Sequence, residues 1–85
     1  MARVTIRYWA GAREAAGVDV ETFEAATVED AIALAEHGRG GDAEFARVLG
    51  LCSFLLDGRR VGPADRTRPL TDDVELEALP PFAGG

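Results

Sequence analysis

The 85-residue chain contains no lysine, one cysteine and one histidine. A single cysteine, Cys52, excludes an internal disulfide framework and is typical of a reducing compartment. The single histidine, His37, excludes a histidine relay or a multi-histidine metal centre, so we expect no bound metal. No apolar run approaches the ~20 residues that cross a bilayer, and the polar start lacks the apolar core of a signal peptide. We therefore expect a soluble, cytoplasmic protein with no membrane association.

Positive charge is also scarce, because nine arginines face fifteen acidic residues and the net charge is −6. Nucleic-acid binding requires a basic footprint, so this class of partner is not expected. An acidic surface instead suits solubility or a protein partner with a basic patch. The hydrophobic fraction of 47% and the short length predict one folded domain with a modest core.

The first 24 residues carry the pattern of two strands. Residues 3–9 alternate between apolar and polar side chains, which predicts a half-buried strand. Residues 10–17 are flanked by glycines and are long enough for about one helical turn. Residues 18–24 predict a second strand that forms a hairpin with the first across a loose loop. Phe23 has the opposite parity to the two valines of this strand, which indicates a bulge or a partly exposed aromatic.

Two helices are predicted in the middle of the chain. Thr27 is a good N-cap, and the apolar residues from 28 to 35 keep the spacing of one helical face. His37 and Gly38 mark the expected end of this helix. Asp42 is expected to cap a shorter helix with an apolar stripe.

The C-terminal third predicts further strands. Residues 52–56 form a compact apolar run, which indicates a strand covered on both faces or nearly so. An Asp-Gly turn at 57–58 leads into a short return strand at 59–61. Residues 62–73 are expected to form a long irregular loop, and residues 74–79 alternate again as a last strand.

This element order predicts an α+β fold. A hairpin, one main helix and further strands fit a β-grasp: a mixed sheet of four to five strands packed on one helix. We expect residues 1–79 to form this domain and residues 80–85 to form an extended C-terminal tail.

The side chains offer no self-contained active site. His37 is expected to be exposed or to interact with a helix dipole, and Cys52 to be a buried, inert thiol. The glycine-rich stretches lack the spacing of phosphate-binding loops. If the chain takes part in chemistry, its reactive group is therefore not a side chain.

The remaining functional group is the α-carboxylate of Gly85, at the end of the stretch LPPFAGG. A carboxylate reacts with nucleophiles once ATP has adenylated it. Glycine lacks a Cβ, so Gly84 and Gly85 can thread a narrow channel. Pro80 and Pro81 favour an extended stem, and the seven residues from 79 onward reach at most ~20–25 Å.

Three segments carry a resemblance to a known family: YWAGAREAAG (8–17), TVEDAIALA (27–35) and PLTDDVELEALPPFAGG (69–85). The chain resembles the MoaD/ThiS family of sulfur-carrier proteins, which are ubiquitin-like β-grasp domains ending in Gly-Gly. The third segment is the specific one, and it is similar to the end of the small subunit of molybdopterin synthase.

The resemblance implies a mechanism and a set of partners. An E1-like adenylyltransferase would activate Gly85 with ATP, and a sulfur donor enzyme would convert it to a thiocarboxylate. The tail would then enter the large catalytic subunit of molybdopterin synthase and deliver sulfur to the molybdopterin precursor. The chain itself would bind no cofactor and would not be an enzyme. Residues expected to dock the tail are Leu79, Pro80, Pro81, Phe82, Ala83 and Gly84.

The sequence leaves several points open. Arg13 and Glu14 match the early motif, and the alternative is a structural role in fixing their loop. The segment 52–69 is longer and richer in arginine than the corresponding segment common in the family. Its arginines are expected either to lie in a solvated loop or to meet an acidic partner surface. Alternative functions are sulfur delivery for cysteine or thiamine biosynthesis, protein modification in the manner of ubiquitin, and a plain interaction domain.

Overall fold

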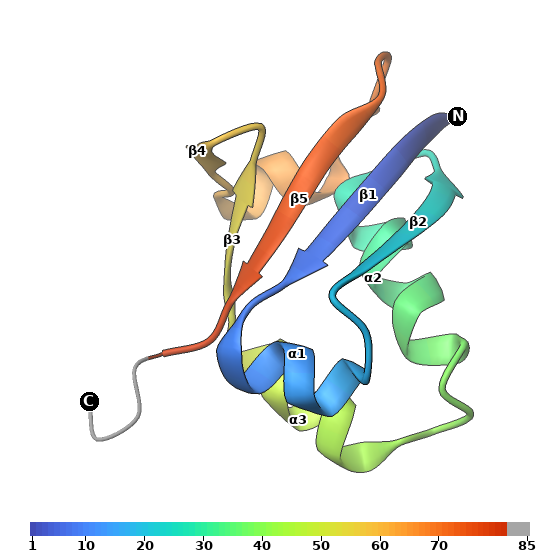
Figure 1. Cartoon of the computed structure of the whole chain (residues 1–85). Helices are drawn as coiled ribbons and strands as arrows, with labels where there is room; N and C mark the ends of the chain where they lie inside the picture. Colours follow the sequence, from blue (N-terminus) through green and yellow to red (C-terminus); the bar gives the residue numbers. More distant parts are fainter. Residues whose placement is uncertain (82–85) are drawn as a thin grey trace.

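In the computed structural model, residues 1–81 are described, and they form a five-stranded mixed sheet with helices packed against it (Figure 1). The strands are β1 (Ala2–Tyr8), β2 (Val20–Ala25), β3 (Ser53–Leu56), β4 (Arg59–Arg60) and β5 (Val74–Leu79). The helices are α1 (Ala10–Ala16), α2 (Val28–His37) and α3 (Ala43–Leu51), with a 3-10 helix, η1 (Pro63–Thr67). None of the helices in this described part has the length and apolar character needed to span a bilayer.

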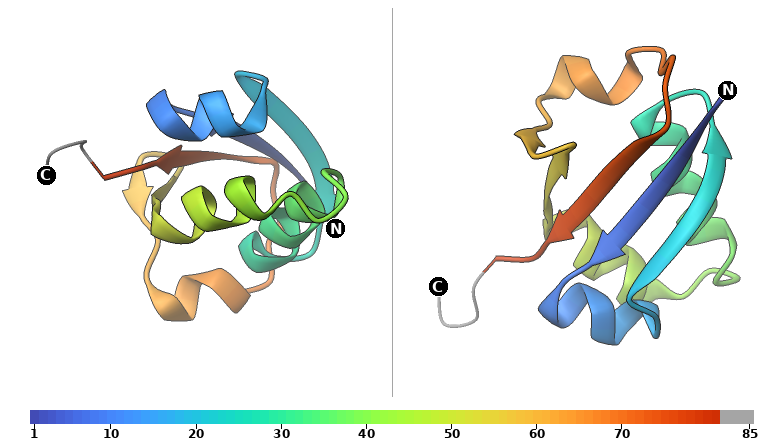
Figure 2. Two further views of the ribbon diagram at one scale, coloured as in Figure 1. Left: turned by 90° about the horizontal axis from the view of Figure 1, so that it is seen from below. Right: turned by 45° about the horizontal axis from the view of Figure 1, so that its top comes forward.

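The strand order is β2-β1-β5-β3-β4, and β1 and β5 pair in parallel at the centre of the sheet. The remaining pairs are antiparallel. This arrangement confirms the predicted β-grasp class, with α2 as the main helix after the first hairpin. Figure 2 shows the same sheet from two further sides, with the C-terminal end of β5 leading out of the domain.

Local sequence accounts for the helix boundaries. The Thr27 hydroxyl accepts a hydrogen bond from the Asp30 N–H at 3.0 Å, so α2 begins where its N-cap was predicted. Asp42 caps α3 in the same way, because its carboxylate accepts from the backbone N–H groups of Glu44 and Phe45. These side chains satisfy donors that a helix start otherwise leaves unpaired.

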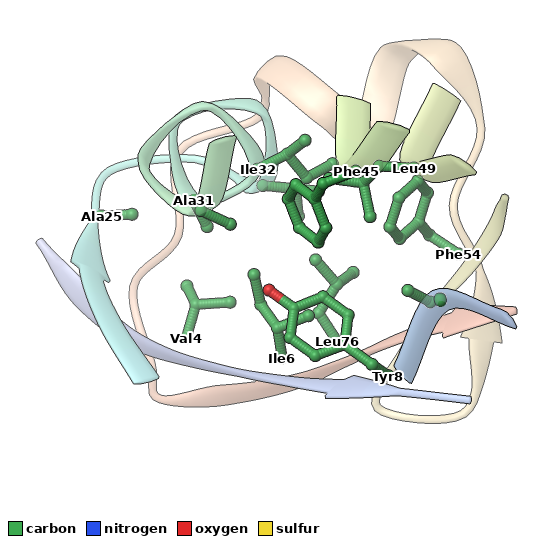
Figure 3. Packing of buried hydrophobic residues seen from close by; sticks show 14 residues of the cluster. Val4, Ile6, Tyr8, Ala25, Ala31, Ile32, Phe45, Leu49, Phe54 and Leu76 are labelled. Atoms are coloured by element: carbon green, nitrogen blue, oxygen red, sulfur yellow. The ribbon is translucent and has the colours of Figure 1, made fainter. Parts of the chain in front are cut away.

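The core lies between one face of the sheet and the helices (Figure 3). Alternate residues of the central strands point inward, so Val4, Ile6 and Leu76 are almost completely buried. Phe45 of α3 meets Tyr8 edge to face, with ring centroids 5.8 Å apart. At about 25 cal/mol per Å² of buried apolar area, this layer supplies the main driving force for folding.

The helical turn expected between β1 and β2 is present but longer than predicted, because the connection contains the seven-residue helix α1 instead of a loose loop with one turn. Its small residues allow close packing, and Ala12 is buried in the core. Gly17 ends the helix in the left-handed conformation, with a φ of 80°, which glycine adopts without a Cβ penalty.

The predicted irregular loop at 62–73 is also only partly correct, because it contains η1. The Asp65 carboxylate accepts a hydrogen bond from the Gly62 N–H at 2.7 Å, and the Asp65 N–H donates to the Gly62 carbonyl at 3.0 Å. These two bonds close the short helical turn.

Two expectations about side-chain faces need correction. The register of β1 with β2 is continuous from Ala2 to Arg7, so β2 has no bulge within this pairing, and the other predicted alternative, a partly exposed Phe23, is confirmed. Phe23 is half-buried on the helix side, whereas Val20 is exposed on the open face. β3 is covered unevenly, because Phe54 is buried and Leu56 is half-buried on the core face, while on the other face Leu55 is half-buried and Ser53 is exposed.

Candidate functional site

The sequence-predicted site is the C-terminal tail, and the structure describes where it leaves the domain. β5 ends at Leu79, which is half-buried, and Pro81 is exposed. Phe82, Ala83, Gly84 and Gly85 lie outside the described residues. The structure therefore locates the root of the tail, while the predicted roles of residues 79–85 stay predictions.

A mostly apolar groove of about 750 Å³ lies beside this root, and we call it the tail-root groove. Three parts of the chain meet there: the β1–α1 junction, the α3–β3 junction and the end of β5. Its lining residues are Trp9, Ala10, Gly11, Leu51, Ser53, Leu79, Pro80 and Pro81. Apolar concavities with a few polar groups are typical binding sites for partners and ligands.

Trp9 and Leu51 give the groove its exposed apolar surface. The side chain of Leu51 is 57% exposed and that of Trp9 is 44% exposed, although both are large and apolar. An exposed apolar patch next to a predicted functional segment marks an interaction surface. Sequence reasoning identified neither residue as part of the site, because it is the fold that brings the ends of β1, α3 and β5 together.

Hydrogen bonds fix the Trp9 ring and backbone. The indole Nε1 donates to Glu77 Oε1 at 3.0 Å, and the Trp9 backbone N–H donates to the Ala78 carbonyl at 3.2 Å. The Arg7 guanidinium lies 6.0 Å from the centroid of the indole ring. Ala10, the next residue, has a φ of 46°, in the left-handed region that L-residues rarely adopt. The chain therefore turns sharply from β1 into α1 at the edge of the groove.

The open face of the sheet next to the groove carries paired charges. Arg3 lies 3.7 Å from Glu24, and Arg7 lies 3.8 Å from Glu75, in ion pairs between neighbouring strands. Exposed pairs of this kind contribute little to stability. The open face beside the groove is therefore charged, whereas the groove itself is mostly apolar.

The other candidate residues take structural positions. Arg13 lies 3.7 Å from Asp19 in an exposed ion pair, which connects α1 to the start of β2 and fits a loop-fixing role. The Cys52 thiol donates to the Val48 carbonyl at 3.3 Å, and burial raises its pKa to about 11, so it is a poor nucleophile near neutral pH. His37 is the exposed last residue of α2.

Known proteins resemble this chain over its whole length. The molybdopterin synthase sulfur carrier subunit of Chlamydomonas reinhardtii is 34% identical over 88 aligned residues, which cover 98% of this chain and 99% of the relative. No family model matches the sequence.

Solved structures share the fold. The small archaeal modifier protein 1 of Methanosarcina acetivorans has a TM-score of 0.81 and 23% identity, covering 100% of this chain and 98% of that one. Subunits 1 and 2 of the molybdopterin-converting factor of Helicobacter pylori have been solved as a complex. The match in that complex has a TM-score of 0.69 and 22% identity, covering 98% of this chain and 99% of that one. At these identities the structural likeness supports the β-grasp fold.

Proposed function

Because the chain belongs to the family of molybdopterin synthase sulfur carrier subunits, we propose that Gly85 carries sulfur for molybdopterin biosynthesis as a C-terminal thiocarboxylate. The observation that carries this proposal is the full-length match, together with the tail-root groove beside the residues that begin the tail. The domain presents the tail, and the chemistry takes place on partner proteins.

The first step uses ATP on an E1-like adenylyltransferase. A carboxylate oxygen of Gly85 attacks the α-phosphorus, pyrophosphate leaves, and an acyl-adenylate forms. A sulfur donor enzyme then supplies sulfur at the oxidation level of sulfide, so that a C–S bond forms, the bond to AMP breaks, and a thiocarboxylate remains. ATP is a substrate of the partner, and this chain needs no cofactor of its own.

The second partner is the large catalytic subunit of molybdopterin synthase. The complex of the Helicobacter pylori subunits supports an assembly of this kind. We propose that the tail-root groove packs on the large subunit while residues 80–85 extend into its active site. Six extended residues reach at most ~20 Å, so a channel of this depth can be reached without unfolding the domain.

The proposal is tested by the intact mass of the chain after incubation with its adenylyltransferase, ATP and a sulfur source. Replacement of one terminal oxygen by sulfur is expected for the full chain. The matched control lacks only Gly85 and should gain no sulfur, while its melting temperature stays within about 1 °C of the parent because chain ends outside the core contribute little stability.

Other outcomes would support other functions. High-mass conjugates with target proteins would favour a ubiquitin-like modifier, the function suggested by the name of the archaeal structural neighbour. Transfer of sulfur to a cysteine or thiamine precursor, but not to the molybdopterin precursor, would reassign the pathway. An unchanged mass with authentic partners present would refute the carrier mechanism.

A further inference from the structure

Positive charge is concentrated at one edge of this acidic protein. Residues 57–68 contain four arginines and two aspartates, whereas the rest of the chain contains five arginines and thirteen acidic residues. This segment runs from the turn after β3 through β4 and η1. The molecule therefore has a locally basic edge on an acidic background.

The β3–β4 hairpin holds two of these arginines, Arg59 and Arg60, in a defined place. Asp57 and Gly58 have φ values of 48° and 84°, as in the tight turns that match the twist of a two-stranded hairpin. The Asp57 N–H donates to the Glu75 carbonyl at 2.8 Å, and its carboxylate accepts from the Glu75 N–H at 2.9 Å. These bonds anchor the turn to the central strand β5.

The aspartates of this edge already have partners. One oxygen of Asp65 accepts from the Gly62 N–H, and the other pairs with Arg68 at 2.5 Å. Within residues 1–81, the side chains of Arg59 and Arg60 make no ion pair or hydrogen bond. Both line a groove of about 360 Å³ whose apolar part includes Leu56 and Val61. Their guanidinium groups are therefore available to an external acceptor.

The basic edge is connected to the tail-root groove by a row of side chains across the open face. Arg60 pairs in register with Leu55, and Leu55 pairs with Glu77. The Glu77 carboxylate accepts the hydrogen bond from Trp9, which lines the tail-root groove. Since neighbouring strands are ~4.8 Å apart, Arg60 lies about 10 Å across the sheet from β5. A partner that covers the groove and extends about 10 Å beyond β5 would also reach Arg60.

We propose that Arg59 and Arg60 bind an acidic patch on the large catalytic subunit that receives the tail. The proposal rests on the proposed function and adds a second, electrostatic contact to it. Successive strand residues point to opposite faces, so the two arginines span the sheet edge instead of converging on one small anion. Guanidinium groups bind carboxylates with paired hydrogen bonds, and opposite charges speed the encounter of proteins that must also separate again.

The test reverses both charges in the full chain, Arg59→Glu with Arg60→Glu, and measures binding to the cognate large subunit. The affinity at ~0.1 M salt is expected to fall at least about tenfold, mainly through a slower association rate. The difference in affinity between the variant and the parent should become smaller at ~1 M salt, where the electrostatic screening length is only ~3 Å. The control reverses Arg3 and Arg47, which changes the net charge equally but lies outside this edge; its affinity should change less than about threefold.

A second variant, Arg59→Gln with Arg60→Gln, is included in case the charge reversal disturbs folding. Its affinity for the large subunit should also fall, but by less than that of the charge-reversal variant. Equal weakening of the test and control variants would mean that only net charge matters and would overturn the proposal. Unchanged binding would mean that the arginines merely protect an edge strand from aggregation. Binding of the same variants to the adenylyltransferase is measured in parallel. If the charge reversal weakens only that binding, the choice of partner is overturned. If the parent chain does not bind the large subunit, the proposed function fails, and this proposal fails with it.

Discussion

Arg39 is expected to be the most important charged residue for the stability of the domain. It lies after α2, and its side chain is only 13% exposed. The guanidinium pairs with Glu21 of β2 at 2.9 Å and donates to the carbonyls of Ala35 and Ala16 at 2.9 and 3.0 Å. It also lies 4.0 Å from the ring centroid of Phe45. One side chain thus connects β2 with all three α-helices.

The substitution Arg39→Met keeps much of the aliphatic packing and removes the charge. Hydrogen bonds to charged groups contribute ~1.5–3 kcal/mol each, and a partly desolvated cation over an aromatic ring contributes ~1 kcal/mol. Their sum overstates the effect, because water can reach Glu21, whose side chain is 29% exposed. We therefore expect the free energy of unfolding to fall by about 2–4 kcal/mol, which in a domain of this size lowers the melting temperature by about 10–25 °C.

Chemical unfolding followed by Trp9 fluorescence and circular dichroism measures this loss. Glu21→Gln alone should lower the free energy of unfolding by less, since Arg39 keeps both carbonyl acceptors. The double variant, Glu21→Gln with Arg39→Met, should lower it by less than the sum of the two single effects. The control is Arg47→Met: its ion pair with Glu44 is exposed on both sides, so its unfolding midpoint should not change measurably. A loss below about 0.5 kcal/mol for Arg39→Met would refute this account of the network.

Two further predictions concern the groove and the thiol. Leu51→Asp, which places a charge on the exposed wall of the tail-root groove, should weaken binding to the large subunit at least about tenfold while the melting temperature changes little. The control is Leu34→Asp, at an exposed helical leucine outside the groove, and equal affinities of the two variants would exclude the groove from the interface. Cys52 should be alkylated by iodoacetamide more slowly at pH 8 than a free thiol, and the rate should rise with pH towards about 11, where its pKa lies. Since partial burial raises the folded-state pKa of Cys52 above its ordinary value of 9.0, the stability that the protonated thiol contributes is complete below pH 9 and is lost as pH rises towards about 11. Alkylation at pH 8 as fast as that of a free thiol would contradict the partial burial and raised pKa of the Cys52 thiol.

Features that depend on neighbouring residues could be predicted from the sequence. The caps at Thr27 and Asp42 and the Asp57-Gly58 turn were located correctly, because each depends on a hydrogen bond or a φ angle within a few residues. The alternation in β1 and β5 also identified their buried faces, because these strands lie at the centre of the sheet. One face of each central strand is buried against the helices, so apolar and polar residues alternate regularly along it.

Features that depend on distant residues could not be predicted. β2 is an edge strand, and its valine at position 20 faces solvent while Glu21 faces the helices. That inversion is stable because Arg39, eighteen positions later, supplies a counter-charge, and the Tyr8 hydroxyl donates to the same carboxylate at 2.7 Å. Burial and this hydrogen bond raise the pKa of the Tyr8 hydroxyl, so it stays protonated as a donor. The sequence around Glu21 does not indicate that its carboxylate will pair with Arg39 on the helix side of the sheet.

The position of Arg39 connects stability to the proposed function. Its contacts fix the end of α1 through Ala16 and lie against Phe45 of α3. The other ends of the same two helices supply Ala10, Gly11 and Leu51 to the tail-root groove. Because packed helices move as rigid units, a cluster that fixes α1 against α3 also fixes the shape of the groove. A carrier that reacts through its terminal carboxylate needs no catalytic side chain, but it does need a rigid surface that places the tail the same way on each partner.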